Sequence, residues 1–119
     1  MKINDYQELS KRTMPKSVSV VGKPIYTRDS MVNYIMGLSG ETGEFIDLIK
    51  KKWYHHHPIS NEDVKKELGD ILHYWVGLCD MFGFTAEEVA TENLFKLGKR
   101  YPNGFNVEDS MRRVDVENA

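Results

Sequence analysis

Cysteine is almost absent from this chain: Cys79 stands alone, so no disulfide can form within it. Secreted folds that depend on disulfides are thereby excluded, and a reducing compartment is expected. No apolar run approaches the ~20 residues that cross a membrane as a helix. The opening residues MKINDYQELSKR lack the apolar core of a secretory signal. We therefore expect a cytoplasmic protein with no membrane partner.

A strong charge of one sign is also missing. The formal net charge is −2 at pH 7, and the sequence pI is about 6.1. Domains that bind nucleic acid usually carry a marked basic excess, so no nucleic-acid polymer is expected as a partner. The 119 residues suffice for one domain. A chain this short gains much apolar burial from oligomerisation.

Helical periodicity dominates the sequence. Apolar residues recur at helical spacing, and no segment alternates as a strand does over any length. The pattern predicts four helices. The first spans residues 4–12, the second is capped by Asp29 or Ser30 and runs to about Trp53, the third is capped by Ser60 and runs to about Phe82, and the fourth runs from Thr85 to about Lys99. Thr85 and Glu88 form a capping box for the last of these. The fold class is therefore all-α, a helical bundle completed by oligomerisation.

Proline and glycine mark the connections between these helices. Residues 13–28 contain two prolines and one glycine, and the pattern leaves the structure of this connection open. Pro58 interrupts the helical pattern between the second and third helices. We expect one functional domain over residues 1–106, followed by a polar and loosely ordered tail over residues 107–119.

Four carboxylates lie at the margins of two predicted apolar stripes. The stripes comprise Leu38, Phe45 and Leu48 on the second helix, and Val64, Leu68, Ile71, Trp75 and Leu78 on the third. At ~100° per residue, Glu41 lies within the first stripe and Glu44 at its edge. Glu67 lies at the margin of the second stripe and Asp70 just outside it. Each helix thus presents two carboxylates, spaced i, i+3, toward the edge of the core.

These two acid pairs suit a metal ion. Helices joined by a short loop usually pack antiparallel, so the two pairs can face each other. Carboxylates gathered in a partly buried site repel one another and lose hydration, and a divalent cation relieves both costs. Oxygen-only ligands favour Mg²⁺, for which Mn²⁺ can substitute. An alternative, in which the acids lie on a solvated face of the helices, stays open.

Three glycines accompany the acids. Gly40, Gly43 and Gly69 each precede one of the four carboxylates, and each costs a helix roughly 1 kcal/mol relative to alanine. A bare backbone at these points indicates either close packing between helices or the approach of a ligand.

The acidic pairs belong to an ordered set of motifs. In chain order these are Gly37–Glu44 (GLSGETGE), Glu67–Tyr74 (ELGDILHY), Glu92–Leu97 (ENLFKL) and Arg100–Phe105 (RYPNGF). The set resembles the MazG-like family of all-α nucleoside triphosphate pyrophosphohydrolases. The early pairs Tyr6-Gln7 and Arg12-Thr13 are also similar to short members, so the resemblance extends over roughly residues 4–113.

The resemblance implies a reaction. Members of this family cleave a nucleoside triphosphate between its α- and β-phosphates, giving the monophosphate and pyrophosphate. By motif position, Glu41, Glu44, Glu67 and Asp70 are expected to bind Mg²⁺, while one of Glu41 and Glu44 orients the attacking water. The substrate is expected to be an NTP or dNTP, and the role to be control of a nucleotide pool or removal of aberrant nucleotides. A homodimer or homotetramer is also implied.

The same resemblance also implies which residues contact the substrate. Lys96 and Arg100 share one side of the fourth helix, and the resemblance makes them phosphate contacts together with Asn93. Without the resemblance, they would be an ordinary basic helix end that favours the dipole. Lys51, just after the first acidic motif, is a further candidate for the phosphates.

The base and ribose contacts are less sharply indicated. Tyr74 shares a side of the third helix with Glu67 and Asp70, so it can line a nucleotide pocket or bond a carboxylate. Trp53 is a candidate to stack on a base, although an aromatic residue at a helix end often serves packing. Asn33, two turns before Glu41, can bond a base edge.

Three alternative functions stay open. The first is a phosphoribosyl-ATP pyrophosphohydrolase, a relative with the same fold and acidic motifs. The second is a helical module that binds a nucleotide or protein without turnover. The third is a carboxylate-bridged iron or manganese bundle, which would require histidine three residues after a ligand glutamate. The sequence instead places Asp47 and Asp70 at those positions. A zinc site in the His55–His57 loop is not favoured, because adjacent side chains diverge.

Overall fold

The structure, a computed structural model, describes residues 1–15, 18–20 and 23–116. Its helices are α1 (Ile3–Ser10), α2 (Arg28–Tyr54), α3 (Asn61–Met81), α4 (Ala86–Arg100) and α5 (Val107–Arg112). Two 3-10 helices, η1 (Lys11–Thr13) and η2 (Val114–Val116), and two strands, β1 (Val18–Val20) and β2 (Lys23–Ile25), complete the described elements. The strands are three residues each, so the predicted all-α class is confirmed.

Side-chain caps set where the long helices begin. Thr27, Ser60 and Thr85 each accept a hydrogen bond from the backbone N–H three residues later, which satisfies an otherwise free donor. The capping box at Thr85 is confirmed. The predicted cap of the second helix is wrong: Thr27 caps it in place of Asp29 or Ser30. The helix therefore begins slightly earlier than the apolar pattern indicated.

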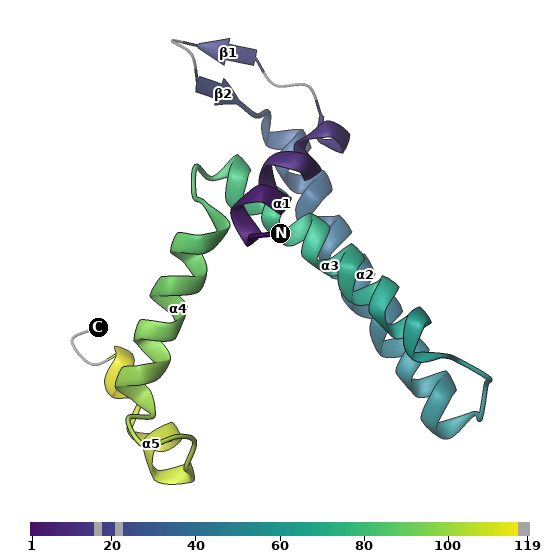
Figure 1. Cartoon of the computed structure of the whole chain (residues 1–119), viewed down its shortest axis with the longest axis vertical. Coiled ribbons are helices and arrows are strands. Elements are labelled where there is room, and N and C mark those ends of the chain that lie inside the picture. Colours follow the sequence, from purple (N-terminus) through teal and green to yellow (C-terminus); the bar gives the residue numbers. More distant parts are fainter. Residues whose placement is uncertain (16–17, 21–22, 117–119) are drawn as a thin grey trace.

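The connection after α1 contains a small hairpin. Strands β1 and β2 pair antiparallel, with Val18 opposite Ile25 and Val20 opposite Lys23, and the hairpin projects away from the helices (Figure 1). The sequence left this connection open because three residues are too few to display a strand alternation.

Helices α2 and α3 form a long antiparallel pair (Figure 1). A side chain on Gly37 of α2 would overlap the ring of Tyr74 on α3, and one on Gly77 of α3 would overlap the ring of Tyr34 on α2. The two tyrosine rings also meet edge to face, with centroids 5.1 Å apart. On each helix, a tyrosine ring packs against a glycine of the other helix. This reciprocal packing fixes the register between α2 and α3.

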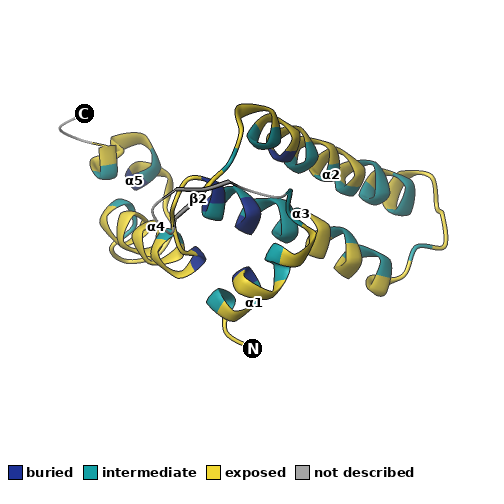
Figure 2. Cartoon of the chain, turned by 90° about the horizontal axis from the view of Figure 1, so that it is seen from above, coloured by how far each residue is buried: buried dark blue, intermediate teal, exposed yellow. Residues whose placement is uncertain are grey.

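Helix α4 leaves this pair at the corner after α3 and diverges from it, giving the molecule a V shape (Figure 1). The Cα radius of gyration is 17.8 Å, whereas a compact chain of this length has about 13–14 Å. Fully buried apolar residues are few among those described, and they lie mostly near the corner (Figure 2). Leu94 and Phe95 on α4 are about 70% exposed. The single chain thus leaves apolar surface uncovered.

Two short helices, α5 and η2, occupy residues 107–112 and 114–116, where the sequence led us to expect a loosely ordered tail; residues 117–119 of that expected tail lie outside the described residues. Asn106 caps α5 through its side-chain oxygen, which accepts the N–H of Asp109 at 2.8 Å. Asp109 is itself buried. Beyond α5, Asp115 of η2 bonds Arg100 at the end of α4. Polar composition suggested disorder here, but these polar groups are used in caps and ion pairs.

Candidate active site

Three of the four predicted metal ligands come together between α2 and α3. One carboxylate oxygen from each of Glu41, Glu67 and Asp70 lies within 4.8 Å of the others. Glu41 lies in the middle of α2, and the other two lie one turn apart on α3. The antiparallel pairing predicted for the two helices is thus what assembles the group. Glu44 is outside this group of three and is exposed.

The acidic cluster contains buried oxygens that lack partners. Oε2 of Glu41 and Oε2 of Glu67 are inaccessible to solvent and make no hydrogen bond to any described residue. The pKa of Glu41 is raised to about 7, first by burial, then by the charge of Glu44 and a hydrogen bond with it, and then by the charges of Asp70 and Glu67. An unpaired buried carboxylate oxygen is costly. The donor set therefore fits a divalent cation, which would satisfy both oxygens and offset the repulsion.

The glycines beside the acids are not required for packing within the chain. A side chain added at Gly40, Gly43 or Gly69 would meet no described atom within 4 Å. Packing instead requires Gly37 and Gly77, where a tyrosine of the opposite helix covers the backbone. The sequence suggested either close packing between helices or the approach of a ligand at these three glycines. Close packing within this chain is wrong. The approach of a ligand stays a prediction.

The predicted phosphate contacts lie away from the acidic cluster in a single chain. Asn93, Lys96 and Arg100 are on α4, which diverges from α2 and α3 (Figure 1). Arg100 is bonded to Asp115, and the Lys96 Nζ lies 3.9 Å from the same carboxylate. The Lys51 Nζ pairs with Asp47 at 2.8 Å on the surface of α2. Within one chain, the cations of α4 and the acids are therefore not brought together.

The predicted base and ribose contacts are also spread out. Asn33 lies near the start of α2 and Trp53 near its end, and both are exposed. Twenty residues of helix separate them by about 30 Å, so one base cannot touch both in a single chain. Tyr74 lies one turn after Asp70, where its ring meets those of Tyr34 and His73 edge to face or nearly so. It is packed between helices beside the cluster.

Sequence reasoning missed a tyrosine on α1. Helix α1 packs across α3, and Tyr6 lies near enough to Asp70 for that carboxylate to raise its pKa, after the larger effect of burial. The pattern predicts the helix itself, but only the similarity of Tyr6-Gln7 to short family members drew attention to this tyrosine. By contrast, the three histidines of the loop after α2 are exposed, and none belongs to the acidic cluster found among the described residues.

Comparison with known proteins gives independent information about this site. A family model, the MazG nucleotide pyrophosphohydrolase domain, matches residues 28–105. The chain belongs to the MazG family. The matched range begins at α2 and ends after α4, so it includes every acid of the cluster and the cations of α4. No curated protein and no solved structure matches the chain.

The MazG family comprises nucleotide pyrophosphohydrolase domains, so the family places this chain with hydrolases that act on nucleotides. None of the helices in the described chain has the length and apolar character to cross a membrane.

Proposed function

We propose that the protein is a Mg²⁺-dependent nucleoside triphosphate pyrophosphohydrolase. It cleaves an NTP or dNTP between the α- and β-phosphates, adding water across that anhydride to yield the monophosphate and pyrophosphate. The observation that carries the proposal is the acidic cluster, in which Glu41 and Glu67 each bury an oxygen with no partner among the described residues. It lies within a MazG domain.

The acids take different roles in this proposal. Glu41, Glu67 and Asp70 hold the cation, because their oxygens already converge. When bound, the cation neutralises phosphate charge and lowers the pKa of a coordinated water. Glu44 is exposed, and its side chain lies beside that of Glu41, one turn away, so it takes the role of general base that accepts a proton from the attacking water.

A second copy of the chain completes the site in this proposal. Residues 87–99 of α4 are exposed except for Val89, and Leu94 and Phe95 leave large apolar areas uncovered. In a homodimer or homotetramer, α4 of one copy covers the α2–α3 pair of another. Its Asn93, Lys96 and Arg100 then face the triphosphate held at the acids. The extended shape of the single chain supports this arrangement.

The test is a measurement of phosphate from a panel of NTPs and dNTPs with Mg²⁺, with and without added inorganic pyrophosphatase. Glu41→Gln and Glu67→Gln are compared with Glu62→Gln, an exposed acid of α3 outside the cluster. We expect phosphate only when the pyrophosphatase is present, loss of this signal in both cluster variants, and no change in the control. Absence of turnover on every nucleotide, with metal binding retained, would overturn the proposal.

A further inference from the structure

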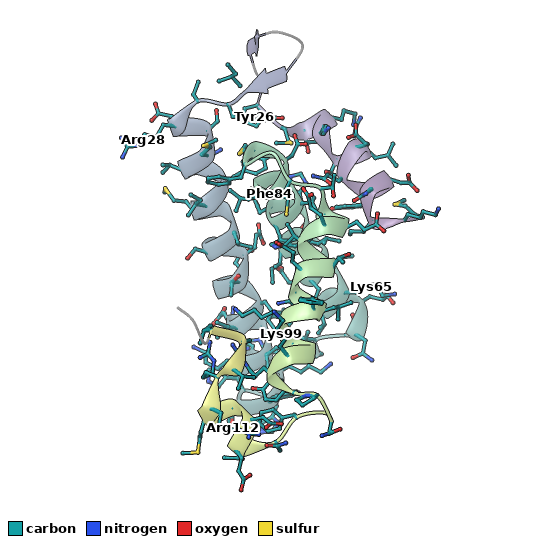
Figure 3. All side chains as sticks on the ribbon, turned by 90° about the vertical axis from the view of Figure 1, so that its left-hand side faces the viewer. Tyr26, Arg28, Lys65, Phe84, Lys99 and Arg112 are labelled. Carbon is teal, nitrogen blue, oxygen red and sulfur yellow. The ribbon has the colours of Figure 1, made fainter. Side chains whose placement is uncertain are left out.

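The corner between α3 and α4 is held by the side chain of Gln7, which comes from α1. Gln7 is 4% exposed, and both ends of its amide are used. Its Nε2 donates to the carbonyl of Phe84 at 2.9 Å, and its Oε1 accepts from the N–H of Ala86 at 2.8 Å. A buried amide with both functions satisfied contributes to a defined geometry rather than to a general apolar core. Phe84 marks this corner in Figure 3.

Helix α4 receives its caps from two different elements. The first N–H groups of a helix have no partner within it. In α4, Gln7 accepts from Ala86, Asn4 accepts from Glu87 at 3.0 Å, and Thr85 accepts from Glu88 at 3.1 Å. A cap is normally supplied by a residue next to the helix. Two of these three come instead from α1, about eighty residues earlier in the chain.

Helix α1 is anchored in turn to the helix that carries two of the acids. It packs on α3, and just beyond its end the Lys11 Nζ lies 3.2 Å from the Asp80 carboxylate near the end of α3. Asp80 also accepts the hydroxyl of Tyr26 at 2.7 Å. The start of α4 is thus tied through α1 to α3, and not only through the four-residue corner.

Beyond the corner, little in the described chain restrains α4. Its side chains are exposed along most of its length, and the ribbon stands apart from the α2–α3 pair (Figure 1). A small rotation at the corner would therefore move the far end of the helix by several ångströms, since α4 is about 22 Å long. Asn93 lies at its midpoint, and Lys96 and Arg100 lie in its second half.

We propose that Gln7 and Asn4 are positioning residues for the reaction: by capping α4 from α1, they fix its direction and hence the place of its phosphate-binding side chains. This inference rests on the proposed function only for its catalytic consequence. The structural part, a fixed direction of α4, is independent of any activity.

The structural part can be tested by distance measurements between spin labels. Lys65 on α3 and Lys99 on α4 are exposed (Figure 3) and are replaced by cysteine, while Cys79 is buried and serves no label. Labelled protein is diluted with excess unlabelled protein, so that only distances within one chain are recorded. We expect one narrow distribution, a broad one after Gln7→Met, and an intermediate one after Gln7→Glu, which keeps only the acceptor. Leu9→Gln, an exposed change on α1, is the control.

The catalytic part is tested with the same variants. Gln7→Met is expected to raise KM for the triphosphate by about tenfold or more, because a misplaced contact is expensive even far from the chemistry. Mn²⁺ affinity, measured on the metal alone, should change less than about twofold, since the acids are on α2 and α3. Asn4→Ala should give a smaller rise in KM. If Gln7→Met does not fold, Asn4→Ala and Gln7→Glu carry both measurements.

The outcomes separate this inference from the proposed function. Equal distance distributions in wild type and Gln7→Met, or a broad distribution in wild type itself, would overturn the positioning role. So would an unchanged KM in a variant whose distances broaden. A wild type that hydrolyses no nucleotide would overturn the proposed function, and the distances would still decide whether α1 fixes α4.

Discussion

Arg100 and Asp115 form a bidentate ion pair in which the Nε and Nη2 atoms of Arg100 each lie 2.6 Å from a carboxylate oxygen. The Asp115 side chain is fully buried, and Lys96 and Arg113 also lie within 4 Å of it. Hydrogen bonds from Arg100 are the main reason that the pKa of Asp115 is lowered to about 2. Three cations thus converge on one carboxylate, which is also how a phosphate is recognised.

This pair predicts how stability depends on pH. Because the pKa of Asp115 is lower in the folded chain than in the unfolded chain, the pair contributes fully above about pH 4 and is lost as the pH falls toward 2. Asp115→Asn should therefore unfold at a lower urea concentration than wild type at pH 6, and the difference should shrink at pH 3. An undiminished difference at pH 3 would contradict the ion pair as its cause.

The packing of tyrosine rings against glycines between α2 and α3 predicts opposite effects for two glycine substitutions. Gly37→Ala should destabilise the protein by roughly 1–3 kcal/mol, because the new methyl group overlaps the Tyr74 ring. Gly43→Ala meets no described atom within 4 Å and should stabilise α2 by up to about 1 kcal/mol. Urea denaturation of both variants measures these changes. Equal destabilisation by the two substitutions would argue against the packing described.

The acidic cluster predicts a pH dependence of metal binding. The pKa of Glu41 is raised to about 7 in the metal-free fold, so the folded chain binds more protons than the unfolded chain between about pH 4.5 and 7. Metal-free stability should therefore fall as the pH rises across this range. A cation displaces that proton, so Mn²⁺ should raise the melting temperature more at pH 8 than at pH 6. Thermal unfolding with and without Mn²⁺ measures this.

The control for that experiment is Glu41→Gln. It removes both the titrating group and one ligand, so the effect of Mn²⁺ should be much smaller and should no longer grow between pH 6 and 8. A pH-dependent effect that persists in this variant would assign the proton to another group.

How much of the fold and of the site the sequence predicts depends on how far apart the interacting residues lie along the chain. The caps at Ser60 and Thr85 are local patterns, and spacing predicts them correctly. Spacing also predicts four carboxylates on facing sides of two helices, of which Glu44 lies outside the group that forms. The meeting of Glu41 with Glu67 and Asp70 also followed, because a short loop forces α2 and α3 to pair. Helix spacing alone was enough to place these carboxylates on facing sides.

The rest depends on contacts between distant residues, which spacing does not encode. The Gln7 side chain accepts a hydrogen bond from Ala86, which lies 79 residues later in the sequence. Nothing in the local pattern around either residue indicates this contact. The direction of α4 was therefore not predictable, nor was the separation of Lys96 from the acids in one chain. The family motif predicts a phosphate contact for Arg100, whereas the fold shows that Asp115 bonds its guanidinium group.

The uncovered surface of α4 predicts that activity requires association. Leu94 is 70% exposed, so Leu94→Arg should cost the single chain little while placing an unpaired charge in an interface, a change typically worth several kcal/mol. Light scattering should show a multiple of the 13.8 kDa chain mass for wild type and the monomer for the variant. The monomeric variant should also release less pyrophosphate than wild type. Lys65→Glu, on the exposed face of α3, should change neither the oligomeric state nor the activity. If a monomeric Leu94→Arg variant kept full activity, α4 would not act on the site of another copy, and its cations would have to reach the acids by a rotation at the corner that Gln7 holds.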